Sequence, residues 1–589
     1  MQSRLPILVF AILMAAIPLI PGVPPFWIVL LDNIGLAALV AMGLVLLTGV
    51  GGLTSFGQAA FVGFGAYTTA VLTTAYGLSP WLTLPLSLLV SGSLAVLLGL
   101  ITVRLSGHYL PLGTLAWGLG LFYLFSKLEF LGRNDGISAI PPLSIGTFKM
   151  LSPGSIYHAI WVAVILSALL TMNLLDSRTG RAIRALRRGH VAAEAFGVHT
   201  PRAKLLVFIH AAVLAGLSGW LYAHLQRAVN PTPFGAHMGI EYLFIAVVGG
   251  AGYVWGGVLG AAIVVILKEV LQSYLPLILP GSGQVETIVF GIMLVALLQL
   301  APGGLWPWLM SFFPERTDGK KPDTSLKLEH RTRAPAEAGV LLQVEKARKQ
   351  FGGVVAVNNV SFDVHAREIV ALIGPNGAGK STTFNLITGV LSATSGSISV
   401  LGRKVDNAPP QEIVKLGISR TFQHVKLVPD MTVLENVAIG AHLRGHSGPI
   451  SSMLRLDRAD EAKLLAEAAR QIERVGLAEQ MHQLAGSLSL GQQRIVEIAR
   501  ALCVDPMLLL LDEPAAGLRH MEKQRLATLL RELRDGGMSV LLVEHDMGFV
   551  MNLADRIVVL DFGTKIAEGT PATIKTNPEV IKAYLGVAA

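Results

Sequence analysis

The sequence predicts a polytopic α-helical membrane domain followed by an α/β domain built around a phosphate-binding loop. Three observations support this prediction. Hydrophobic residues make up 52% of the 589 residues and charged residues only 15%, which is far from the average of soluble proteins. Between Leu5 and Val103 the only formally charged residue is Asp32, whereas residues 311–338 are rich in charged side chains. Residues 374–382 match the phosphate-binding pattern GxxxxGK[ST].

Apolar stretches long enough to cross a membrane fill the first part of the chain. A helix of about 20 apolar residues spans the ~30 Å hydrocarbon core of a bilayer. Six candidates precede Asp176, at residues 6–21, 27–47, 55–75, 81–103, 109–126 and 157–175. The first could instead be a secretory signal peptide, because Arg4 precedes a short apolar run. The five candidates that follow favour a membrane span.

The basic residues after the sixth candidate predict the orientation. Residues 176–204 carry seven Arg and Lys residues against Asp176 and Glu194, so the positive-inside rule places this segment in the cytoplasm. Six spans then put the N-terminus on the cytoplasmic side as well. Arg104, after the fourth candidate, falls on the same side.

Three further apolar stretches follow Lys204, at residues 205–225, 242–267 and 288–300. Three spans would leave the phosphate-binding part outside the cell, where nucleotide is scarce, so we expect an even number. Glycines within residues 249–257 predict a break in the second stretch, which is tolerated at membrane depth where protein or a water-filled cavity covers it. Residues 270–279 are expected to supply another short crossing. The prediction is therefore eight to ten spans, with the glycine break near the pathway across the membrane.

The remaining composition argues against other classes of protein. The net charge of +8 is explained by cytoplasmic loops facing anionic membrane lipid and requires no nucleic acid. Cys503 is the only cysteine, which excludes a disulfide framework and a cysteine-based zinc site, and its apolar surroundings in the sequence predict a core residue. A charge deep in a membrane helix costs about 3 kcal/mol, so Asp32 is expected to face an interface, polar headgroups or a cavity.

The phosphate-binding loop lies between a strand-like segment, residues 368–373, and a helix-like segment, residues 383–387. Its glycines let backbone N–H groups turn inward around a phosphate, and the following helix directs its positive end at that charge. Lys380 is expected to reach the outer phosphates of ATP, and Ser381 to hold Mg²⁺. The predicted nucleotide-binding residues are Gly374, Pro375, Asn376, Gly377, Ala378, Gly379, Lys380, Ser381 and Thr382.

Strands on both sides of this loop complete the predicted α/β domain. Residues 341–344 and the alternating apolar positions between 357 and 364 predict strands that lead into the loop. Downstream, residues 507–514 form an apolar strand that ends in two carboxylates. Asp512 is expected to support the metal, and Glu513 to polarise the water that attacks the γ-phosphate.

Three further motifs resemble those of ATP-binding cassette (ABC) ATPases. Residues 488–494 resemble the signature motif, residues 543–546 the switch-histidine motif and residues 420–423 the Q-loop. The resemblance implies that His545 is catalytic and that Gln423 reaches both the metal and the attacking water. It also implies that Phe351 stacks on adenine.

The same resemblance implies a nucleotide site divided between two cassettes. The phosphate-binding loop of one cassette faces Ser489, Gly491 and Gln492 of another, where a helix N-terminus and a hydroxyl bind the γ-phosphate. Hydrolysis therefore requires a second cassette. Residues 515–520 depart from the family, because most cassettes place an aspartate here and the branched-chain amino acid branch usually places Asn-Pro after Gly-Leu. This chain has Arg519 and His520 instead, which bears on the contact between the two sites.

Both halves of the chain resemble transporters for hydrophobic amino acids. Residues 556–571 and 583–586 look like the tail of their cassettes, and residues 52–67, 134–142 and 180–197 are similar to segments of their permeases. The resemblance implies a permease at residues 1–310, a charged cytoplasmic linker at 311–338 and an ABC ATP-binding domain at 339–589.

Two segments of the membrane half leave alternatives open. Residues 191–197 read as a short helix, which the family places in a groove of the ATPase near Gln423, although a solvated positive loop would carry the same arginines. The small residues between 52 and 65 are explained equally well by close helix packing and by contact with the solute.

The function implied by the resemblance is ATP-driven import of branched-chain or other hydrophobic amino acids across the bacterial inner membrane. Relatives in this family also carry amides, urea or aromatic acids. The implied partners are a second permease, a second ABC ATPase and a periplasmic solute-binding protein. An exporter half-transporter has the same domain order and is the alternative; dependence on a binding protein would discriminate. A soluble cassette ATPase acting on DNA or ribosomes is a third class, which membrane extraction would test.

Overall fold

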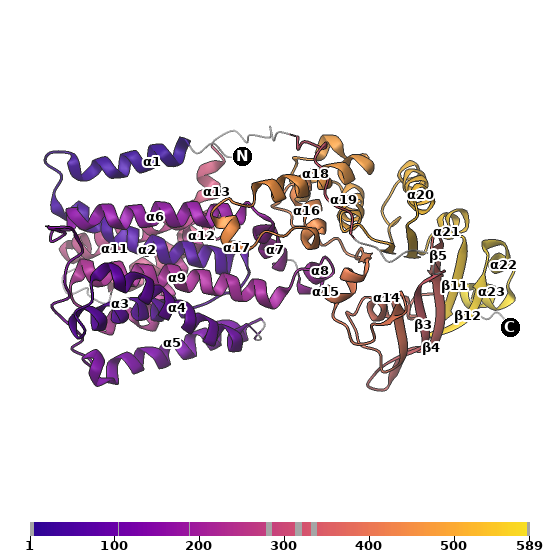
Figure 1. Ribbon diagram of the computed structural model, residues 1–589, viewed down its shortest axis with the longest axis horizontal. Helices are drawn as coiled ribbons and strands as arrows, with labels where there is room; N and C mark the ends of the chain where they lie inside the picture. Colours follow the sequence, from indigo (N-terminus) through magenta and orange to yellow (C-terminus); the bar gives the residue numbers. More distant parts are fainter. Residues whose placement is uncertain are drawn as a thin grey trace. The chain divides into compact units, whose positions relative to one another are not determined.

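The computed structural model describes residues 5–103, 105, 107–187, 189–278, 285–312, 321–331 and 339–585. The chain forms two compact units, whose elements are labelled in Figure 1. The first comprises Met1–Asp176 and Pro201–Arg316, and the second Ser177–Thr200 and Thr317–Ala589. The domain boundaries at residues 310 and 339 remain a prediction. The structure adds that the segment Ser177–Thr200, between two membrane helices in sequence, packs with the second unit.

The first unit is built from apolar helices. Their bounds are α1 (Leu5–Ala16), α2 (Pro25–Leu44), α3 (Gln58–Thr74), α4 (Pro80–Thr102), α5 (Tyr109–Lys127), α6 (Pro153–Leu175), α9 (Thr200–Gln226), α10 (Ala236–Gly249), α11 (Val254–Ile278), α12 (Val285–Leu300) and α13 (Leu305–Met310). Within the described part of the chain, six helical segments are long and apolar enough to cross a membrane. The helical membrane domain is thus confirmed, and the total of eight to ten spans remains a prediction.

Two interruptions of the helices lie against each other. α2 continues as a π-helical turn over Val45–Val50 and is followed by irregular residues up to Gly57. The predicted glycine break is confirmed between α10 and α11, where Gly250 has a φ of +115°. A Cβ on Gly49 would lie 1.1 Å from the carbonyl oxygen of Ala251, so only glycine allows this approach.

One expectation about the first unit is wrong, and another is narrowed. Residues 270–278 form no separate crossing but continue α11, because no glycine or proline interrupts residues 261–275. Asp32 has no exposed area, which excludes contact with headgroups and leaves a helix interface or an enclosed cavity of the three expected surroundings. It lies on α2, which packs against α6 with Gly35 close to Ile160, and neither carboxylate oxygen has a hydrogen-bond partner among the described residues.

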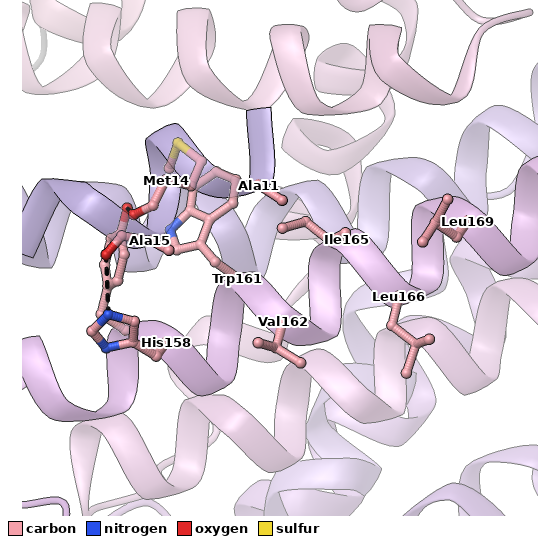
Figure 2. Close-up of a pocket in the computed structure, with 10 residues that line it drawn as sticks. Ala11, Met14, Ala15, His158, Trp161, Val162, Ile165, Leu166 and Leu169 are labelled. Atoms are coloured by element: carbon pink, nitrogen blue, oxygen red, sulfur yellow. Dashed lines mark hydrogen bonds between the residues drawn. The ribbon is translucent and has the colours of Figure 1, made fainter. Parts of the chain in front are cut away.

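An apolar pocket lies between α1 and α6 (Figure 2). Met14, Trp161 and Leu166 are among the side chains that line it. The polar groups at its end bond within the protein, since the Tyr157 hydroxyl donates to the carbonyl of Met14 and a ring nitrogen of His158 bonds to the carbonyl of Ala15. Its lining therefore suits an apolar occupant better than a charged solute.

The second unit contains a six-stranded sheet of order β12-β11-β5-β10-β9-β8. The strands are β5 (Ile369–Ile373), β8 (Ile418–Arg420), β9 (Leu508–Asp512), β10 (Ser539–Val543), β11 (Arg556–Asp561) and β12 (Thr564–Gly569). All pairs are parallel except that of β11 with β12. Every residue of β5, β9 and β10 is buried, as expected for continuous apolar strands of a parallel sheet.

A second, four-stranded antiparallel sheet has the order β4-β3-β6-β7. It comprises β3 (Val340–Phe351), β4 (Val354–His365), β6 (Ser395–Val400) and β7 (Arg403–Lys404), and the first two confirm the strands predicted ahead of the phosphate-binding loop. Apolar side chains of both sheets and of helix α14 (Lys380–Ile387) form one core.

A helical region completes the second unit. It includes α16 (Val433–Ala438), α18 (Arg458–Arg474) and α19 (Leu490–Leu502). These helices surround an apolar cluster to which Cys503 belongs, so the prediction of a core cysteine is confirmed. The same cluster contains Leu328, from the segment that was predicted to be a linker.

Candidate functional site

The phosphate-binding loop runs from the end of β5 to the start of α14. Gly374, Gly377 and Gly379 all have positive φ angles. A Cβ on Gly374 would lie 2.1 Å from the Leu560 carbonyl oxygen, so this position requires glycine for space as well as for conformation. The Lys380 ammonium donates to the carbonyl oxygens of Gly374 and Pro375, at 2.7 and 2.9 Å. Its burial lowers the pKa of Lys380, while the charges of Glu513 and Asp512 act in the opposite direction.

Three of the residues predicted to be catalytic lie together beyond the end of β9. Glu513 Oε1 accepts a hydrogen bond from Gln423 Nε2 at 3.1 Å and lies 2.9 Å from Nε2 of His545. The Glu513 backbone has a φ of +51°, a strained conformation for a residue with a side chain. The arrangement places a carboxylate, an amide and an imidazole around one point.

Arg494 connects the Q-loop to the end of β9, and sequence reasoning gave it no role. Its guanidinium donates to the backbone carbonyls of Glu513, at 2.9 Å, and of Gln423, at 3.1 Å. Because it holds both backbones, Arg494 fixes the distance between the two side chains. Its place in the signature-motif segment was the only signal that could have identified it.

The surroundings of Asp512 fit a divalent cation. Asp512 is buried, and its Oδ1 has no hydrogen-bond partner in the described part of the chain. Oδ2 lies 3.9 Å from the guanidinium of Arg420, which in turn donates to Asn385. Burial raises the pKa of Asp512, and the nearby Glu513 adds to this effect. An unpaired, buried carboxylate oxygen is the kind of ligand that Mg²⁺ prefers.

The signature motif begins helix α19. Ser489 is the N-cap residue, and Gln492 completes a capping box with it: the backbone N–H of Gln492 donates to Ser489 Oγ, and that of Ser489 to Gln492 Oε1. A pocket of about 400 Å³ lies here, lined by Ser489, Leu490, Gly491, Gln492, Gly517, Arg519 and Glu522. Arg519, the departure from the family, therefore lies in the same pocket as the signature serine.

Phe351 ends strand β3 on the antiparallel sheet. Its ring is 46% exposed, and the ammonium of Lys349 lies 5.1 Å from the ring centroid. An exposed aromatic face leaves room for a base to stack. The adenine-stacking role of Phe351 remains a prediction.

The segment Ser177–Thr200 binds the helical region through its arginines. It forms α7 (Arg178–Leu186) and α8 (His190–Glu194), the second of which confirms the predicted short helix. Arg181 forms a buried bidentate ion pair with Glu461. Arg184 pairs with Glu435 at 3.1 Å. Arg181 and Arg184 therefore belong to a packed interface, and for them the alternative of a solvated loop is wrong.

Two further contacts extend this interface. The Arg178 guanidinium donates to the backbone carbonyls of His442, Gly445 and Ser447. Phe196 packs under the guanidinium of Arg500 at 4.5 Å, and Arg500 donates to the carbonyl of Lys426, three residues after Gln423. The segment is thus connected, through one buried arginine, to the backbone of Lys426 just beyond the Q-loop.

Residues 321–331, which we name the strap, also bind the helical region. Arg470 donates to the strap carbonyls of Thr324 and Leu326, and Arg444 donates to those of Leu328 and Glu329. Arg331 donates to the carbonyls of Val414 and Lys415, outside the helical region. The strap is therefore held to the second unit by hydrogen bonds of its backbone carbonyls and by the buried Leu328, while most of its side chains are exposed.

Comparison with known proteins agrees with both units. Residues 28–298 match the family of permease components of the branched-chain amino acid transport system. Residues 357–516 match the ABC transporter family, and residues 564–589 match the branched-chain amino acid ATP-binding cassette transporter family.

Curated relatives match the second part of the chain. The high-affinity branched-chain amino acid transport ATP-binding protein LivG of Salmonella typhimurium is 46% identical over 251 residues, which is 42% of this chain and 98% of LivG. The corresponding protein BraF of Pseudomonas aeruginosa is 42% identical over the same shares. A solved nucleotide-free ATP-binding cassette from an ABC transporter is 33% identical and aligns over 42% of this chain and 100% of its own, with a TM-score of 0.38.

Proposed function

Since this chain belongs to the branched-chain amino acid ABC transporter family and carries both a permease and an ATPase domain, we propose that it imports branched-chain or other hydrophobic amino acids. Its ATPase domain couples ATP hydrolysis to transport. The proposed location is the bacterial inner membrane. The proposed partners are a second permease, a second ABC ATPase and a periplasmic solute-binding protein.

The observation that carries this proposal is the packing of Ser177–Thr200 into the second unit. This segment connects α6 to α9, so a movement of the helical region is transmitted directly to two membrane helices. The buried Arg181–Glu461 pair makes the connection rigid. The path from Phe196 through Arg500 leads to Lys426, three residues after Gln423, and supports a link between this segment and the nucleotide site.

Each residue of the nucleotide site has a proposed part in ATP hydrolysis. Backbone N–H groups of residues 374–382 and the ammonium of Lys380 hold the phosphates, and Phe351 stacks on adenine. Ser381, Asp512 and Gln423 would hold Mg²⁺, which neutralises phosphate charge when bound. The Glu513 carboxylate accepts a proton from the attacking water.

Two other groups complete the reaction. His545 holds the Glu513 carboxylate in place and faces the γ-phosphate. Ser489 and the N-terminus of α19 bind the γ-phosphate of the nucleotide held by the partner cassette, so hydrolysis takes place when two cassettes close on ATP.

The experiment that tests the function is labelled leucine uptake in the native cell. It compares the wild type with Lys380→Ala at equal protein level, and with Lys463→Ala, an exposed lysine of α18, as the matched control. We expect uptake to disappear in the first variant and to persist in the second. Uptake that persists in Lys380→Ala would contradict ATP-driven leucine import by this chain.

A further inference from the structure

Helix α3 begins in the interior of the membrane unit after an interruption. Residues 51–57 are not helical, and Gln58 is the first residue of this 17-residue helix. The first backbone N–H groups of an α-helix have no partner within the helix, and its N-terminus carries a partial positive charge. An interrupted membrane helix of this kind presents that charge away from water.

A second helix begins at the same place. α10 starts at Ala236, and a Cβ on Gly239, in its first turn, would lie 2.1 Å from the carbonyl oxygen of Phe56. The backbone two residues before α3 therefore touches the first turn of α10. Two helix N-termini meet here, and their partial charges have the same sign.

Two residues beside this meeting point, Gln58 and Trp117, have buried polar atoms without partners among the described residues. Gln58 has no exposed area, and neither atom of its amide has a hydrogen-bond partner among the described residues. The indole N–H of Trp117 is likewise buried without one, and its ring packs so closely on Gly57 that a Cβ there would lie 2.3 Å from it. A buried polar group left unpaired costs about 1–3 kcal/mol, so folding alone gives no reason for the amide of Gln58. The ring of Trp117 also packs against Phe61 and Phe208.

Neighbouring polar groups are occupied within the protein. Thr114 Oγ1 accepts from the N–H of Phe56 at 3.1 Å and donates to the carbonyl of Pro111 at 2.9 Å. The carboxylate of Glu241, which follows Gly239 by two residues in α10, is paired with the ammonium of Lys268 at 2.9 Å. The groups left over at the meeting point thus include two N–H donors, of Gln58 and Trp117, beside two positive helix ends.

The depth of this point follows from helix α9. Phe61 packs on Phe208 and Thr69 contacts His224, so α3 and α9 run in the same direction. Gly65 touches Gly216, which lies about 24 Å along α9 from Thr200. Gln58 precedes Gly65 by seven residues, or about 10 Å, which places it about 14 Å from the start of α9. The predicted span begins at Leu205, about 8 Å along α9, so Gln58 lies about 6 Å inside the ~30 Å hydrocarbon core, toward its cytoplasmic side.

We propose that the N-termini of α3 and α10, with the side chains of Gln58 and Trp117, bind the carboxylate of the transported solute. Gln58 Nε2 and Trp117 Nε1 donate to the carboxylate oxygens, and Gln58 Oε1 accepts from an α-ammonium group one carbon away. The inference rests on the proposed import function and specifies its substrate class: free amino acids and other carboxylic acids, rather than neutral amides or urea. The solute enters when α3 and α10 separate, since Gln58 is closed off here.

The test replaces Gln58 with methionine, which has nearly the same shape and no hydrogen-bonding amide. Removing an unpaired buried amide should leave the melting temperature of the purified transporter unchanged or raise it. Maximal leucine uptake at saturating binding protein should fall about 10- to 100-fold, the equivalent of one hydrogen bond to a charged group. The concentration of leucine at half-maximal uptake should not change, because the binding protein sets it.

Thr114→Val is the structural control, because it breaks bonds that the structure shows and should lower the melting temperature. Gln58→Glu adds a negative charge and should abolish uptake of a carboxylate. If Gln58→Met melts several degrees lower, the amide is structural and the proposal fails. Uptake that persists in Gln58→Met or Gln58→Glu overturns it as well.

The wild type separates this proposal from the proposed function. If the wild type carries an aromatic acid and not leucine, the proposal of amino acid import is contradicted and the proposal of a carboxylate site is supported. If it carries urea or an amide, both fail.

Discussion

The Nε2 atom of His545 and the Oε1 atom of Glu513 lie 2.9 Å apart, although the residues are 32 positions apart in sequence. Adjacent parallel strands bring them together, because Glu513 follows β9 and His545 follows β10. Gln423 donates to the same Glu513 oxygen, from the segment after β8. Three neighbouring strands therefore each deliver one side chain to the same edge of the sheet.

Glu513→Gln should bind ATP without turning it over. The amide keeps the size of the carboxylate but cannot accept a proton from water, so we expect turnover to fall about 10²- to 10⁴-fold. ATPase rate and bound nucleotide are measured on the assembled transporter, with Glu412→Gln, an exposed carboxylate paired with Lys415, as control. Turnover within twofold of the wild type would exclude the assigned role.

Arg181→Ala should destabilise the second unit strongly. It leaves Glu461 as a buried charge without its partner, which costs about 3–5 kcal/mol. Replacing both residues with methionine should recover most of this loss, since no charge then remains buried. Arg184→Ala is the control, because its pair with Glu435 is partly exposed and should be worth at most about 1 kcal/mol. Thermal unfolding measures all three; equal losses for both single variants would refute the argument.

Leu328→Ala should open the apolar cluster of the helical region to reagents. Cys503 belongs to that cluster and has no exposed area, and burial raises the pKa of its thiol. Maleimide labelling of this single cysteine should therefore be slow in the folded wild type. Truncating Leu328 costs about 2–5 kcal/mol and should accelerate labelling. Leu326→Ala, at an exposed position of the strap, should not; equal rates for both variants would mean that the strap does not close the cluster.

Arg519→Asn restores the residue usual in the branched-chain amino acid branch and tests the departure from the family. Arg519 lines the pocket of Ser489, where a guanidinium adds attraction for the γ-phosphate held by the partner cassette. The KM for ATP should rise about tenfold, the equivalent of ~1.4 kcal/mol. Arg525→Asn is the control, because Arg525 lies in helix α20 (His520–Asp535), which Arg519 precedes, and does not line this pocket. A KM that does not change in Arg519→Asn would show that its charge does not reach the nucleotide.

Features carried by local sequence were predictable. The strand, loop and helix around Lys380 follow from glycine spacing and an apolar run, and the break at Gly250 follows from adjacent glycines. The roles of Gln423 and His545 came from family resemblance alone, because nothing in their local sequence indicates that strands β8 and β10 flank β9.

Features that depend on distant partners were not predictable. Arg181 and Glu461 are 280 positions apart, and an arginine in a cytoplasmic loop is equally consistent with solvent. Asp32 and Gln58 lie in apolar stretches whose composition does not indicate the face on which a polar side chain lies. Leu328 follows a run of charged residues, and nothing in that run indicates that its side chain enters the apolar cluster of the helical region.

The strap lies in sequence between the permease and the ATPase and makes contacts with the ATPase. Lys321 pairs with Glu473, and the strap carbonyls that follow accept hydrogen bonds from Arg470 and Arg444. Contacts made by residues before the cassette therefore stabilise the folded ATPase. Cutting the gene at the boundary of the cassette homology would remove these contacts. A two-gene version of this transporter should therefore assign residues 321–331 to the ATPase gene, and a cassette that begins at residue 339 should express as an incompletely folded protein.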